Sequence, residues 1–190
     1  MAGGAGTADL VELKNGRMIR IDGLKSSDRQ RYLAAVESLS RRTLHLRFLS
    51  PIRAISDAQV ERFLDVGHDG HEALIAVSCD TAEIVGVARL APDPTKGDFV
   101  ELAVVVVDAW QFQGIGSCLL DRLVELARSC GYQWAGAASL VENAAATAML
   151  RARGFKVGAT TSYGVVEWSL ELLREGGLGG QEPRDIIDEK

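Results

Sequence analysis

Hydrophobic and polar residues alternate along several short stretches of the chain, and one stretch near the middle is almost entirely apolar. Alternation with a period of two is typical of strands with one buried face, and it predicts strands at 16–21 and 164–172. The run 98–107 (DFVELAVVVV) is apolar on both faces from Leu102 onward, which predicts the central strand of a sheet. The same signals predict three more strands, at 72–78, 83–90 and 133–140.

Capping residues followed by apolar residues three or four positions apart predict the helices. The segment 41–50 (RRTLHLRFLS) is basic and aromatic, and a proline follows it. The order of elements is a strand, two helices, three strands, a helix, a strand, a helix and one or two strands, which predicts an α/β sandwich with a mixed sheet. The helices are predicted at 26–40, from Ser56 onward, at 117–130 and at 143–153.

The length of 190 residues fits one domain with short appendages. The first residues are rich in glycine and alanine, and the last are rich in glycine and acidic residues. We therefore predict a mobile N-terminal segment at 1–15, a single domain at 16–174 and a disordered acidic tail at 175–190.

Composition and charge narrow the class of protein. Hydrophobic residues make up 47% and charged residues 25%, which is ordinary for a soluble globular protein, and the net charge of −5 argues against a protein that coats nucleic acid. No apolar run approaches the roughly 18 residues of a membrane span. Cys118 and Cys130 would lie about 18 Å apart on one helix, beyond disulfide reach. We therefore expect reduced thiols, a cytoplasmic location and no membrane partner.

A compact loop, 108–116 (DAWQFQGIG), connects the central strand to the helix at 117–130. A loop with two glycines at this place lets backbone amides converge on a pyrophosphate at the helix N-terminus. The loop contains neither G-x-x-x-x-G-K-[ST] nor G-x-G-x-x-G, which disfavours nucleotide hydrolysis and dinucleotide binding. By itself, Q-x-x-G-x-G is also compatible with a simple turn at the start of a helix.

The spacing Q-x-x-G-x-G resembles the acetyl-CoA-binding signature of the Gcn5-related N-acetyltransferases, the GNAT superfamily. The segment 143–155 (NAAATAMLRARGF) resembles the N-x(10)-G-F helix of that family. The stretch 100–116 (VELAVVVVDAWQFQGIG) and RFLSP at 47–51 are similar to the bacterial protein-lysine acetyltransferase branch. The resemblance spans nearly all of 16–172 and implies a GNAT-like α/β/α sandwich with a central mixed, mostly antiparallel sheet.

The resemblance implies an acetyl-CoA-dependent N-acetyltransferase without a metal. Glu101 occupies the position of the general base, and the amide of Val105 would polarise the thioester carbonyl. A lysine amine has a pKa of about 10.4, so a proton must leave it before attack. Glu101 and Val105 lie about 13 Å apart along the strand, so Glu101 would act through a water. The implied acetyl-CoA-binding residues are Val105, Val107, Gln111, Gln113, Gly114, Ile115, Gly116, Ser117 and Asn143.

The sequence departs from the family at one catalytic position. Many members have a tyrosine seven residues after the asparagine, which protonates the leaving thiolate, and here that position is Leu150. A CoA thiolate leaves without much help, so activity is still expected. The favoured acceptor is a protein lysine, attacking directly without a covalent enzyme intermediate. A small-molecule amine acetyltransferase, a non-catalytic acyl-CoA sensor and a homodimer stay open.

Several histidine, cysteine, arginine and tryptophan residues can be interpreted either as functional or as purely structural. His68 and His71 fit a solvated loop better than a zinc site, because no cysteine or carboxylate cluster of suitable spacing accompanies them. Cys118 fits a core position better than a reactive thiol at a helix N-terminus. Arg41, Arg42 and Arg47 suit either the 3′-phosphate of CoA, an acidic substrate patch or a solvated face. Trp110 is expected to hold the loop against the core.

Overall fold

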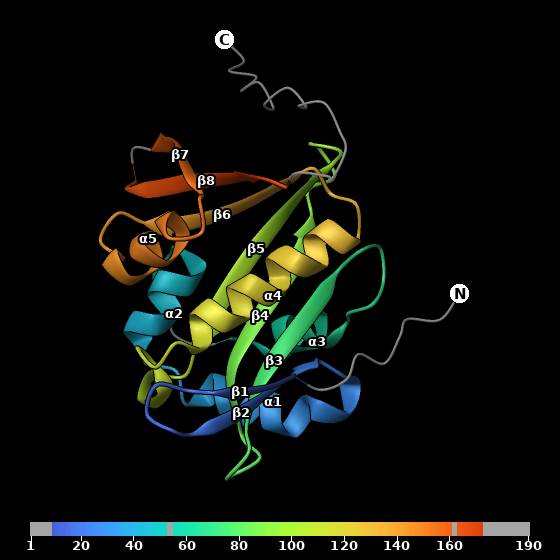
Figure 1. Cartoon of the computed structure of the whole chain (residues 1–190). Helices are drawn as coiled ribbons and strands as arrows, with labels where there is room; N and C mark the ends of the chain where they lie inside the picture. Colours follow the sequence, from blue (N-terminus) through green and yellow to red (C-terminus); the bar gives the residue numbers. More distant parts are fainter. Residues whose placement is uncertain (1–8, 53–54, 161–162, 173–190) are drawn as a thin grey trace.

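The computed structural model describes residues 9–52, 55–160 and 163–172. Its centre is an eight-stranded sheet in the order β1-β2-β3-β4-β5-β6-β8-β7 (Figure 1). Neighbouring strands are antiparallel except β5 and β6, which are parallel, so the predicted mixed, mostly antiparallel sheet is confirmed. The strands are β1 (Asp9–Glu12), β2 (Met18–Gly23), β3 (Glu72–Ser78), β4 (Ile84–Pro92), β5 (Phe99–Val106), β6 (Trp134–Leu140), β7 (Lys156–Thr160) and β8 (Val165–Glu171).

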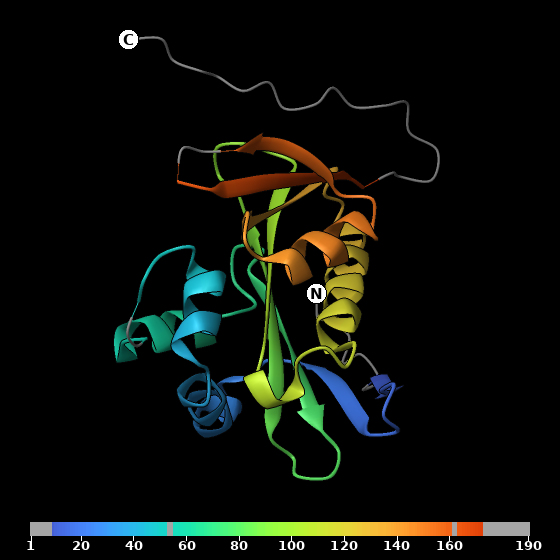
Figure 2. The same cartoon turned by 90° about the vertical axis from the view of Figure 1, so that its left-hand side faces the viewer.

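Helices cover both faces of the sheet, as Figure 2 shows edge-on. Ile115, Leu119 and Leu123 of α4 are buried in the larger core, and Tyr32 of α1 and Val60 of α3 are buried in a second core against the other face. The sandwich expected from the sequence is therefore present. One layer holds α1 (Arg29–Glu37), α2 (Arg41–Phe48) and α3 (Asp57–Leu64), and the other holds α4 (Ile115–Ser129) and α5 (Ala144–Arg151).

The helix α2 is an element that the sequence pattern did not predict. Ser40 caps it, since its hydroxyl accepts a hydrogen bond from the amide of Thr43, and Leu49 ends it in the left-handed conformation with φ of 57°. Its apolar residues Leu44, Leu46 and Phe48 fall two positions apart, a spacing more typical of a strand. The helix forms because Thr43 and Leu44 are buried against the rest of the fold.

The N-terminal boundary of the domain differs from the prediction. Residues 9–15 were expected in the mobile segment, but Asp9–Glu12 form β1 and pair with β2. Leu13 is buried in the larger core, and Asp9 forms an ion pair with Arg122 of α4. These contacts order a segment that is too short to show a clear period. The expectations for residues 1–8 and for the acidic tail at 175–190 fall outside the described residues.

The sheet opens between its two parallel strands. The register of β5 with β6 covers three pairs, from Phe99 with Trp134 to Glu101 with Gly136. Beyond Gly136, β6 continues to pair with β8 as far as Leu140. The two parallel strands therefore diverge after Glu101, and a gap opens between them. The ring of Phe99 fills the space where a side chain at Gly136 would lie, directly beside this point.

Candidate active site

A cleft of about 260 Å³ occupies the gap between β5 and β6. Its floor is the exposed edge of β5, and its sides come from α2, α5 and the first turn of α4. The gap thus provides a site that reaches from the N-terminus of α4 to the middle of the central strand. The residues that line it include Thr43, Leu46, Arg47, Val104, Val105, Val106, Gln111, Phe112, Gly114, Gly116, Ser117, Asn143, Ala146 and Met149.

Two hydrogen bonds determine which backbone groups of β5 face the cleft. The amide of Val107 donates to the carbonyl oxygen of Val85, 2.9 Å away, on the side of β4. At the other end of the strand, the carbonyl of Asp98 accepts from the amide of Trp134, 3.1 Å away, on the side of β6. Because backbone groups of successive residues point to opposite edges of a strand, odd-numbered residues face β4 and even-numbered residues face β6.

This register corrects the sequence-based choice of amides. Val105 and Val107 were expected to bind acetyl-CoA, the former through its amide. Val105 is the register partner of Val87, and the amides of Val105 and Val107 point toward β4. Val104 and Val106 present their backbone groups to the cleft instead. The family pattern locates the strand correctly, whereas the alternation of amides depends on a register that the sequence does not display.

The first turn of α4 presents unpaired amides at one end of the cleft. The first helical bond runs from the amide of Cys118 to the carbonyl of Gly114, and Gly114 has φ of 98°. Among the described residues, no backbone hydrogen bond uses the amides of 113–117, as expected at a helix N-terminus. The amide of Gln111 donates to the carbonyl of Asp108, so this amide is already paired, although Gln111 lines the cleft.

Asp108 and Gln111 tie this loop to α2. The carboxylate of Asp108 accepts hydrogen bonds from the Ser40 amide and hydroxyl and from the Thr43 hydroxyl, at 2.6 to 2.9 Å. Desolvation raises the pKa of Asp108, but the bonds from Ser40 and Thr43 outweigh it, so the pKa lies below its ordinary value. The Gln111 side chain donates to the Thr43 hydroxyl and to the Val106 carbonyl. The sequence did not predict this network, and the signal that points to it is Ser40, a residue type favoured at the N-cap of a helix.

The late helix α5 closes the opposite side of the cleft. Asn143 caps it by accepting a hydrogen bond from the amide of Ala146, 3.1 Å away, and also lines the cleft. Met149 lines the cleft, whereas Leu150 is buried in the larger core. The position at which many family members have tyrosine therefore carries an apolar side chain directed away from the cleft.

Glu101 lies where β5 and β6 separate. Its side chain is exposed and shares a face of β5 with those of Val105 and Val107, which pack in the core under α1 and α3. Arg47 of α2 lies close enough for the Glu101 charge to raise its pKa, although burial lowers that pKa more. Glu101 is accessible to solvent and to an acceptor on the face of the sheet that carries the α1–α3 layer.

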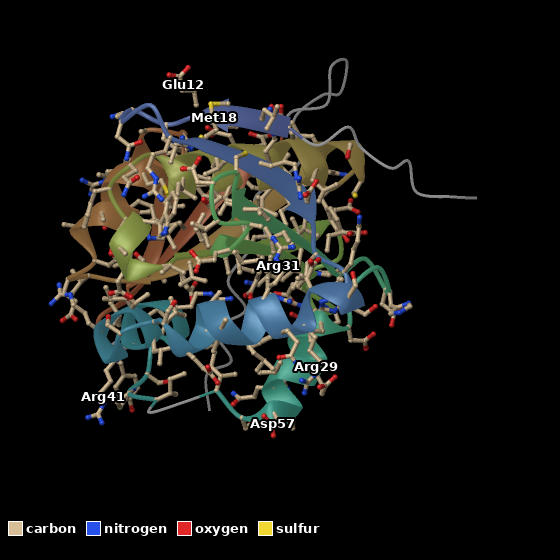
Figure 3. The ribbon with its side chains drawn as sticks, turned by 90° about the horizontal axis from the view of Figure 1, so that it is seen from below. Glu12, Met18, Arg29, Arg31, Arg41 and Asp57 are labelled. Atoms are coloured by element: carbon tan, nitrogen blue, oxygen red, sulfur yellow. The ribbon has the colours of Figure 1, made fainter. Side chains whose placement is uncertain are left out.

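The remaining candidates divide into surface and core positions. Figure 3 shows Arg41 on the outer surface of the α1–α3 layer, and Arg42 is exposed as well, whereas Arg47 lines the cleft. Burial raises the pKa of the Cys118 thiol, as fits a core position. Trp110 is buried in the larger core under Arg17, which lies 3.4 Å above its ring. In the described part of the chain, no group of three or more potential metal ligands gathers, and no helix could span a membrane.

Comparison with known proteins assigns the family. Residues 40–155, more than half of the chain, match the model of the acetyltransferase (GNAT) family. The chain belongs to the GNAT acetyltransferase family. The matched region runs from the cap of α2 to the end of the α5 turn, so it includes every element that lines the cleft.

Individual GNAT relatives agree in sequence and in fold. The chain is 30% identical over 145 residues to the acetyltransferase PA5475 of Pseudomonas aeruginosa, covering 75% of this chain and 77% of that one. It is 27% identical over 135 residues to the acetyltransferase Pat of Mycolicibacterium smegmatis, of which it covers 40%. The GNAT domain of S. lividans PAT superposes with a TM-score of 0.81 at 24% identity, covering 90% of this chain and all of that domain.

A further structural relative contains the co-substrate. The acetyltransferase yncA of Salmonella typhimurium, solved with acetyl-CoA, superposes with a TM-score of 0.69 at 22% identity, covering 84% of this chain and 96% of that one. At this level of identity the likeness concerns the fold alone.

Proposed function

We propose that the protein transfers the acetyl group of acetyl-CoA to a primary amine by direct attack, and that the acceptor is a lysine side chain of a protein. The observation that carries the proposal is the cleft between β5 and β6, which joins unpaired amides at the start of α4 to the exposed edge of the central strand. A long ligand with a diphosphate at one end and an amide-containing arm at the other matches this arrangement.

The amides of 113–117 would hold the pyrophosphate of acetyl-CoA. They converge at the positive end of the α4 dipole, which favours a negative group. At Gly116 the first carbon of a side chain would make ordinary contacts with Met149 and Val106, at 3.5 and 3.6 Å, and would occupy part of the space beside the backbone. The chain therefore suits a bulky diphosphate in contact with backbone.

The pantetheine arm would lie along β5. The backbone groups of Val104 and the amide of Val106, which face the cleft, would bond its amides as a neighbouring strand would, whereas the carbonyl of Val106 already accepts from Gln111. An amide in the same row would accept the negative charge that develops on the thioester oxygen during attack. The thiolate of CoA would leave as the C–S bond breaks, without a protic side chain at Leu150.

Glu101 would receive the proton of the attacking amine. Its separation of about 10 Å from Val104 along the strand, three residues at about 3.3 Å each, requires water between the carboxylate and the amine. The nitrogen forms the new bond to the acetyl carbon, and its proton passes through that water to Glu101. The protein-lysine acceptor rests on the similarity to the Pat proteins. A small amine is the second candidate, favoured by a partly open pocket of about 30 Å³ beside Val105.

Substitution of Glu101→Gln tests the proposed chemistry. The exposed strand residue Glu171 offers a matched control, as Glu171→Gln. CoA release is followed with lysine peptides and with polyamines, while calorimetry follows acetyl-CoA binding. Loss of the base lowers kcat by about 10²- to 10⁴-fold and removes the acidic limb of the pH profile, with acetyl-CoA binding intact. An unchanged rate would remove Glu101 from the mechanism, and binding without turnover in the wild type would favour an acyl-CoA sensor.

A further inference from the structure

A partly open pocket of about 30 Å³ lies between the sheet and the α1–α3 layer, directly behind the cleft. Residues from α1, α2, α3, β4 and β5 line it. Arg47 and Val105 line both the pocket and the cleft, so the two spaces meet at the centre of β5. The pocket therefore opens next to the place where the acetyl group of the proposed co-substrate would lie.

Two arginine side chains make this pocket cationic. The guanidinium of Arg47 lies 5.0 Å from the ring centre of Phe48, and that of Arg89 lies 5.1 Å from the ring centre of Phe63. Arg89 also donates a hydrogen bond to the carbonyl of Phe63. Within residues 9–52, 55–160 and 163–172, neither arginine has a carboxylate at ion-pair distance.

Burial makes these charges unfavourable, and the charge of Glu101, which acts on Arg47, offsets the effect of burial only in part. Burial lowers the pKa values of Arg47 and Arg89, yet a guanidinium stays protonated at neutral pH. The third polar group, the hydroxyl of Tyr32, belongs to a side chain that is only 4% exposed. Burial raises the pKa of Tyr32 despite the nearby arginines, so Tyr32 is neutral and offers a hydrogen bond but no charge. A desolvated cation gains most from an anion that reaches it.

The register of β4 with β5 places this charge beside the reacting atoms. Arg89 pairs with Ala103, which lies between Glu101 and Val105 on the same face of β5. A group bound at Arg89 and Arg47 therefore lies between the proposed base and the proposed position of the thioester. Arg89 does not line the cleft, which separates this site from the pyrophosphate end of the co-substrate.

We propose that Arg47 and Arg89 bind a carboxylate of the acceptor, so that the substrate is an amine with a carboxylate a few bonds from the nitrogen. Two guanidiniums offer the paired donors that a planar carboxylate accepts, and about 30 Å³ suits a group of a few atoms. The proposal rests on the acetyltransferase function proposed above. A free amino acid and an aspartate or glutamate next to an acceptor lysine supply the same chemistry.

Matched acceptor pairs test the proposal. One arm compares L-amino acids with their carboxamides, and the other compares lysine peptides that carry aspartate or asparagine beside the lysine. The carboxylate is expected to raise kcat/KM by about 10- to 100-fold in at least one arm, and the arm that responds identifies its source. Arg47→Gln and Arg89→Gln should abolish this preference. Arg41→Gln, which changes an exposed arginine of α2 outside both spaces, should retain it.

Three outcomes would overturn the proposal. Equal rates for both members of every pair would refute the carboxylate site while leaving the acetyltransferase function intact. An equal loss toward both members in Arg47→Gln and Arg89→Gln would indicate a structural role or a role toward acetyl-CoA, which calorimetry with acetyl-CoA separates. Failure of every amine in the wild type would remove the proposed function and this inference together.

Discussion

Gly114→Glu separates a phosphate-binding loop from an ordinary turn. Gly114 has φ of 98°, and beyond its chain neighbours no atom lies within 4 Å of the position of an added Cβ, so a side chain starts there without a clash but with backbone strain. Gly97 provides a matched control, because its φ is 59° and its surroundings are equally open. Each glutamate is expected to cost about 1–2 kcal/mol of folding stability, since both occupy the left-handed region.

The two variants should differ only in ligand binding. The carboxylate of Gly114→Glu would lie beside the amides of 113–117, where it repels the pyrophosphate and competes for the same donors. We expect acetyl-CoA affinity to fall at least about 100-fold, equivalent to about 2.7 kcal/mol. Gly97→Glu should bind as the wild type does.

Calorimetry with acetyl-CoA measures the affinities, and thermal unfolding measures the shared strain. For a chain of this size, 1 kcal/mol shifts Tm by about 2–4 °C, so both variants should melt a few degrees lower. Wild-type affinity in Gly114→Glu would refute the assignment of the amides of 113–117 to the pyrophosphate.

Two further predictions concern the framework of the site. Gly136→Ala should lower the free energy of unfolding by about 1–3 kcal/mol, because its methyl group would overlap the Phe99 ring. The control is Gly158→Ala, whose methyl group meets only an ordinary contact, and thermal unfolding compares the two variants. Asp108→Asn should cost about 1 kcal/mol at pH 7. The pKa of Asp108 is depressed in the folded state, so this stabilisation is present above the unfolded pKa of about 3.9 and is lost as the pH falls through the folded value. Urea unfolding should show the difference at pH 7 and little at pH 2, and a difference independent of pH would contradict the charge-based explanation.

Local periodicity and turn residues in the sequence were enough to predict the central strand and the starts of two helices. The apolar run at 98–107 predicted the central strand, and the residues Gly114 and Gly116 marked the start of α4. The cap at Ser56 likewise predicted α3. These signals are readable because each lies within a few residues and follows from strand alternation, helix period or the conformational freedom of glycine.

The sequence did not predict β1 and α2, because the stability of these short elements comes from contacts with distant parts of the chain. The strand β1 is held by β2 and by Arg122 of α4, and α2 by Asp108, which follows it by a long stretch of chain. The sequence around each of them is too short for a period to emerge. Such elements form only once the sheet and the other layer exist.

The shape and chemistry of the cleft depend on contacts between distant parts of the chain. The divergence of β5 from β6, and the register that turns Val104 and Val106 rather than Val105 toward it, depend on how separate strands align. Arg47 and Arg89 meet Tyr32 although they come from α2, β4 and α1. Strand register and the meeting of side chains in one pocket involve residues far apart in the chain, so a local sequence pattern does not predict them.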